Sequence, residues 1–111
     1  MVFSWFSTDK VDAFVDAEVA ELLRRVPPAR LEGDAAGAQK ARAALEKTHD
    51  LMLRNARDFV QKQRPNLYQK ARIANRLKWA LREAKYPQAF VDEFAYAVAA
   101  VVAAANSQRE I

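Results

Sequence analysis

The chain has 111 residues, of which 51% are hydrophobic and 29% charged, and its net charge is +4. This length suits a single domain, residues 1–111, and this composition is neither that of a disordered chain nor that of a membrane protein. The absence of cysteine excludes disulfides, thiolate metal sites and cysteine nucleophiles, and it fits a cytoplasmic location.

Few turns are expected, because the sequence contains only two glycines and four prolines. The segments between them are rich in Ala, Leu, Arg, Lys, Glu and Gln, which are the strong helix formers. We therefore predict an all-α fold, a single-domain bundle of about four helices. The helices are expected at approximately residues 8–26, 34–64, 67–84 and 87–106.

Residues 1–6 form an apolar leader that contains three aromatic side chains. We expect the leader to pack on the bundle, because a chain end seldom leaves three aromatics in water. Contact with a membrane surface or with a partner protein is the alternative. The first helix has one apolar stripe and is stopped by two prolines. The stripe consists of Val11, Val15, Val19, Leu22 and Val26.

The second helix is expected to span about 45 Å and to overhang its shorter partners. Apolar residues recur on its inner face at intervals of three and four residues. They are alanines in the first half of the helix and bulky residues in the second half. His49 lies in this face, three residues after Glu46. Glu-x-x-His is half of a carboxylate-bridged di-iron motif, but His49 is the only histidine of the chain. We therefore expect a core histidine that is hydrogen-bonded to a carbonyl, a carboxylate or a tyrosine.

Pro65 separates the second and third helices, and Asn66 with Gln69 predicts a capping box. The short connections favour antiparallel packing of helices that follow one another in the chain. Residues 94–105 hold no polar atom except the Tyr96 hydroxyl, which predicts the most buried helix. Twelve apolar residues are too few to span a bilayer, which needs about twenty. Residues 107–111 are expected to be a frayed tail.

Basic residues concentrate in residues 54–85. This segment contains ten Lys or Arg and two acidic residues, which gives it a local charge of +8. Since the net charge is +4, the rest of the chain carries −4. Asp12 and Asp16 are among its acids, one helical turn apart and off the apolar stripe. Such a split predicts internal ion pairing, head-to-tail association or an anionic partner.

The third helix carries the candidate interaction surface. Spacings of three and four residues place its members on or beside one face, opposite an aliphatic stripe. Arginines contact phosphates, and an exposed indole stacks on bases or holds a cation. Three interpretations compete: structural cover of the tryptophan by the leader, a protein partner, and an anionic ligand. The members are Arg72, Asn75, Arg76, Trp79 and Arg82.

A candidate self-association face lies on the fourth helix, at Tyr96, Ala99 and Ala103. Small side chains let a second copy approach closely, although alanine is also the best helix former. The sequence has no glycine-rich phosphate loop, no nucleophile–base–acid set and no pair of inward carboxylates. We therefore predict no enzymatic activity, no cofactor or metal, and no small-molecule substrate.

No specific function follows from these patterns. We expect a small, cytoplasmic, non-catalytic interaction or accessory protein whose partner is another protein or a second copy. One alternative is binding of nucleic acid or another polyanion through the basic face of the third helix. The other is peripheral membrane association through the leader.

Overall fold

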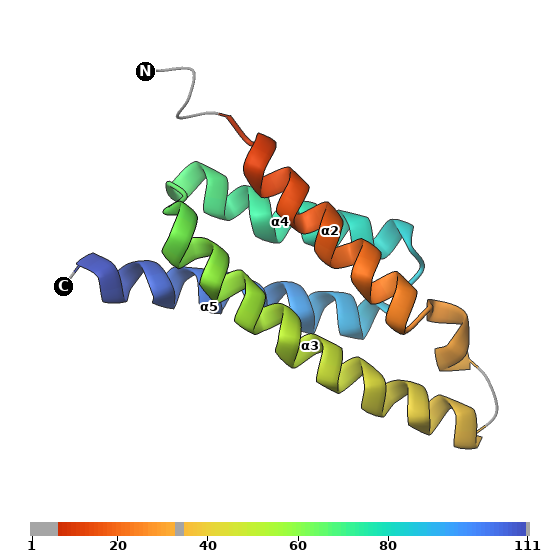
Figure 1. The fold of residues 1–111 in the computed structure, drawn as a ribbon. Coiled ribbons are helices and arrows are strands. Elements are labelled where there is room, and N and C mark those ends of the chain that lie inside the picture. Colours follow the sequence, from red (N-terminus) through yellow and green to blue (C-terminus); the bar gives the residue numbers. More distant parts are fainter. Residues whose placement is uncertain (1–6, 33–34, 111) are drawn as a thin grey trace.

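The computed structural model describes residues 7–32 and 35–110 of the chain (Figure 1). Within these ranges it contains four α-helices, one 3-10 helix and no strand. The elements are α2 (Asp9–Arg25), η1 (Pro28–Glu32), α3 (Ala35–Gln63), α4 (Leu67–Glu83) and α5 (Gln88–Glu110). The prediction of an all-α bundle of about four helices is therefore confirmed.

Most helix ends lie within one residue of their predicted positions, because local sequence features set them. Asn66 caps α4 through a capping box, with 2.9 Å from Gln69 N to Asn66 Oδ1 and 2.9 Å from Asn66 N to Gln69 Oε1. Lys85 follows α4 with a φ of 75°, and the Tyr86 amide donates to the Leu81 carbonyl, as in a Schellman motif.

One boundary differs from the prediction. The helix α5 continues to Glu110 instead of ending at residue 106, since no proline or glycine follows to stop it. The connection after α2 contains η1, which packs on α3. The alanine-rich first half of α3 is thus partly covered, and Ala38 and Ala41 are buried. The leader, residues 1–6, lies outside the described residues.

The helices pack in the pairs α2–α4, α4–α5, α3–α5 and α2–α3. The members of the α2–α4 pair and of the α3–α5 pair run in parallel, whereas α4 and α5 are antiparallel (Figure 1). The predicted antiparallel packing is correct for α4 and α5. It is wrong for α3 and α4, which occupy opposite corners of the bundle although only three residues join them.

Among the described residues, one cluster of buried side chains fills the space between the four helices. Burying each large aliphatic or aromatic side chain contributes about 1.5–3 kcal/mol. Tyr86 closes one end of this core, where its hydroxyl donates to the Val26 carbonyl at 2.7 Å. Over the described residues, no helix is both long and apolar enough to cross a bilayer. The largest fully buried side chains are Phe94, Leu22, Ile73, Leu81, Val15, Val26, Val60 and Val91.

Candidate functional site

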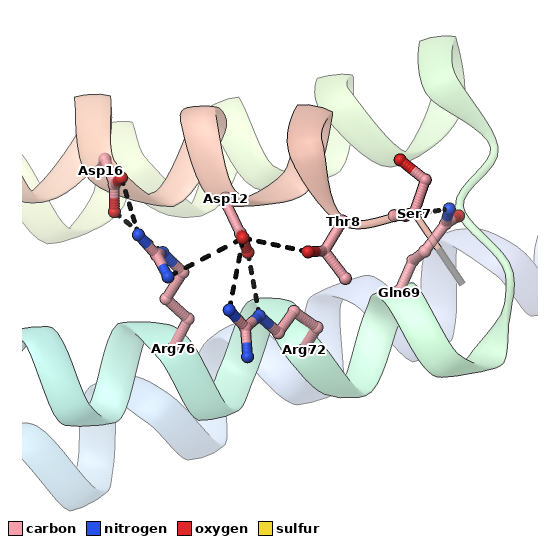
Figure 2. Close-up of polar contacts among 7 residues, drawn as sticks. All are labelled: Ser7, Thr8, Asp12, Asp16, Gln69, Arg72 and Arg76. Carbon is pink, nitrogen blue, oxygen red and sulfur yellow. Dashed lines mark hydrogen bonds and ion pairs between the residues drawn. The ribbon is translucent and has the colours of Figure 1, made fainter. Parts of the chain in front are cut away.

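Two arginines of α4 are paired with two aspartates of α2, a contact that we call the α2–α4 seam (Figure 2). Arg72 Nε lies 2.9 Å from Asp12 Oδ1, and Arg76 Nη2 lies 2.9 Å from Asp16 Oδ2. Each pair is two-pronged, because a second guanidinium nitrogen bonds the other carboxylate oxygen. A residue and its neighbour four positions on share a helix face, so two parallel helices bring both pairs together.

Further polar contacts extend the α2–α4 seam toward the start of α2. Thr8 Oγ1 donates to Asp12 Oδ2 at 3.0 Å, and Gln69 Nε2 donates to the Ser7 carbonyl at 2.7 Å (Figure 2). Arg72 acts mainly through its hydrogen bond to hold the pKa of Asp12 below its ordinary value. The carboxylates raise the pKa of Arg72 and Arg76 in return. The seam is therefore a structural contact between charged groups.

The structure divides the five residues that were predicted to form one surface. Arg72 and Arg76 turn toward α2, and their donors are occupied by carboxylates. Asn75 and Arg82 face solvent, and the Trp79 side chain is 55% exposed. The Arg82 guanidinium carbon lies 5.3 Å from the centre of the Trp79 ring, within cation–π range. The predicted cover of Trp79 by the leader lies outside the described residues.

Asn75 and Tyr96 belong to one shallow depression between α4 and α5, which we call the α4–α5 groove. Its volume is about 660 Å³ and Tyr96, at 79% exposure, stands on its α5 side. Ala99 and Ala103 continue the exposed side of α5. One residue of each predicted surface, Asn75 and Tyr96, therefore lines the same groove. The lining residues are Ala71, Ala74, Asn75, Lys78, Asp92, Ala95 and Tyr96.

Neither Lys78 nor Asp92 was predicted to belong to a site. Lys78 comes from the α4 wall of the groove and Asp92 from its α5 wall. Both helices were predicted, and their antiparallel packing too. The missing information was the rotation of each helix about its axis, which decides the residues that flank the contact.

His49 lines a smaller pocket of about 230 Å³ between α3 and α5. Its Nε2 atom is buried and has no hydrogen-bond partner, so the predicted hydrogen bond is absent at that atom. The ring instead stands edge-on to Phe94, with 4.5 Å between the centres. Glu46 lines the same pocket. Among the described residues, no group of three His, Asp or Glu side chains is arranged to hold a metal ion.

The sequence matches no protein-family model, and comparisons with curated proteins and with solved structures find no match either.

Proposed function

We propose that the protein is a cytoplasmic, non-catalytic interaction protein that binds another protein chain through one exposed surface. This α4–α5 surface consists of the α4–α5 groove, with Asn75, Lys78, Asp92 and Tyr96, and of Trp79, which follows Asn75 by one turn of α4. The observation that carries the proposal is the exposure of two large aromatic side chains, 55% for Trp79 and 79% for Tyr96. Aromatic side chains supply much of the binding energy at protein interfaces, and exposed apolar surface marks such sites.

Binding of a polyanion has less support. Arg72 and Arg76, which carried that hypothesis, are both engaged in the α2–α4 seam. A phosphate would have to compete with a carboxylate that already makes two hydrogen bonds to each guanidinium. The charge near the groove is also mixed, since Lys78 faces Asp92 across it. Membrane association depends on residues 1–6, which lie outside the described residues.

Site-specific photo-crosslinking in living cells tests the proposal. A benzoylphenylalanine placed at Tyr96 or at Trp79 is expected to yield discrete protein adducts. Ala17 is the matched control, because it is an exposed residue of α2. Equal adduct yields at Tyr96, Trp79 and Ala17 would contradict a dedicated α4–α5 surface. Circular dichroism of each variant verifies that the helical fold is retained.

A further inference from the structure

We infer that the partner is a second copy of this chain, and that the α4–α5 groove is the interface of a two-fold symmetric dimer. The inference rests on the proposed function and names the occupant of its surface. Each copy places Tyr96 in the groove of the other. A two-fold interface uses the same patch on both copies, so the patch must be complementary to itself.

The shape of the surface meets this condition. Three alanines, Ala71, Ala74 and Ala95, line this shallow and open depression, and their small side chains leave room for a larger one from a partner. Tyr96 stands beside the depression with 79% of its surface in water. A projecting ring and a hollow therefore lie next to one another on one surface. A two-fold axis between the copies brings each ring opposite the other hollow.

The polar groups of the surface match as well. A buried tyrosine hydroxyl needs a hydrogen-bond partner, and the groove offers the amide of Asn75 and the carboxylate of Asp92. Asp92 is exposed and accepts a hydrogen bond from Gln88 Nε2 at 2.8 Å, which leaves further acceptor capacity. Each wall of the groove thus carries a group that a partner's tyrosine hydroxyl can bond.

The charges of the surface are also self-complementary. Lys78 makes no ion pair within the described part of the chain. It lies on the α4 wall, and Asp92 lies on the α5 wall. A two-fold axis that runs along the groove places α4 of one chain against α5 of the other, which brings each lysine to the other chain's aspartate. A polyanion gains no net electrostatic attraction from a groove with one charge of each sign. A second copy, in contrast, forms two ion pairs with it.

Sedimentation equilibrium of the purified full chain tests the inference over a range of concentrations. The expected species has twice the monomer mass of 12.5 kDa. Tyr96→Ala is expected to weaken the dimer at least tenfold, because it removes the inserted ring. Leu23→Ala is the matched control, an exposed apolar residue of α2 that should leave the dimer unchanged.

A charge exchange provides a second test that does not depend on Tyr96. Lys78→Asp and Asp92→Lys should each weaken the dimer, since each sets like charges against one another. The double variant restores opposite charges and should recover affinity to within about threefold of the original. A dimer that is insensitive to all three substitutions would place its interface elsewhere and overturn the inference.

The crosslinking experiment separates failure of the inference from failure of the proposed function. A chain that stays monomeric at all concentrations, while Tyr96 still traps a different protein, overturns the dimer and leaves the proposed function standing. A monomeric chain with no adduct specific to Tyr96 or Trp79 overturns both. Crosslinked adducts of twice the monomer mass, lost in Tyr96→Ala when the crosslinker is at Trp79, support both.

Discussion

Arg72 forms a two-pronged ion pair with Asp12, which lies 60 residues earlier in the chain, with 2.9 Å between Nε and Oδ1. The same separation of 60 residues recurs between Arg76 and Asp16 and between Tyr86 and Val26. The helices α2 and α4 therefore run in parallel and keep one register along their shared length. The α2–α4 seam determines which residues of α4 remain available to a partner.

We expect Arg72→Gln to lower the free energy of unfolding by about 1 kcal/mol, as for a partly exposed ion pair with good geometry. Asp12→Asn should have a similar effect, and the double variant should lose less than the sum, because the two residues interact directly. Urea unfolding of the four proteins measures this coupling. Arg57→Gln, an exposed residue of α3, serves as the control. Additive losses would mean that the pair contributes nothing in solution.

The Asp12 carboxylate makes stability depend on pH on the acid side. The hydrogen bond from Arg72 lowers the pKa of Asp12 in the folded chain below its ordinary value of 3.8. Folding therefore favours the ionised form, and this stabilisation is present above pH 3.8 and is lost as the pH falls through the folded pKa. Urea midpoints of the unmodified chain should fall more steeply below pH 4 than those of Asp12→Asn.

A second carboxylate titrates in the same range and has to be removed from the comparison. Arg24 and Arg25 lower the pKa of Glu21 to about 2 through hydrogen bonds. Both chains should therefore carry Glu21→Gln. Parallel pH profiles with and without Asp12 in that background would contradict the linkage between Asp12 and folding.

Tyr86 makes stability depend on pH on the alkaline side. Tyr86→Phe leaves the buried Val26 carbonyl without its donor, which should cost about 1–3 kcal/mol near neutral pH. Burial raises the pKa of Tyr86 from 10.0 to about 12 in the folded chain. The folded state thus favours the protonated phenol, so its stabilisation is complete below pH 10 and declines as the pH rises toward 12.

The difference in stability between the unmodified chain and Tyr86→Phe should accordingly shrink between pH 10 and pH 12. Chemical denaturation at several alkaline pH values measures this difference. Leu23→Ala is the control, because that exposed residue of α2 carries no titratable group and lies outside the proposed interface, and it should change stability by less than about 0.5 kcal/mol at each pH. A pH-independent cost of Tyr86→Phe would contradict the linkage.

Local sequence features predicted the helices well, and they failed where helix neighbours had to be chosen. Asn66 and Gln69 specify the start of α4 through contacts within three residues. Asp12 and Asp16 were seen to lie one turn apart, and so do Arg72 and Arg76, but nothing local shows that α2 packs beside α4. The short connection between α3 and α4 favoured the wrong pair, since loop length limits distance and not packing order.

The composition of the α4–α5 groove could not be predicted either, because it also depends on which helices are neighbours. Asn75 and Tyr96 were each singled out from the pattern of one helix, and the structure brings them together. A helical wheel treats one helix at a time, so it cannot show that Asn75 and Tyr96 flank the same contact. The helical wheel also assigned Arg72 and Arg76 to the outward face, because it contains no information on acidic residues 60 positions away in the chain.

The half-buried imidazole of His49 is expected to contribute little to stability. Its Nε2 atom has lost contact with water and gains no hydrogen bond in return, which costs about 1–3 kcal/mol. His49→Leu removes this cost and keeps an apolar group against Phe94. We therefore expect unchanged stability or a gain of about 1 kcal/mol in thermal or urea unfolding.

Phe94→Ala is the matched control for His49→Leu, since Phe94 lies in the same contact, is 1% exposed and should lose about 3–5 kcal/mol. A loss of more than about 1 kcal/mol in His49→Leu would contradict the expectation. It would mean that the imidazole has a polar partner in solution, and a buried water bonded to Nε2 is the simplest one. His49→Gln then distinguishes the two cases, because it restores stability only if that partner exists.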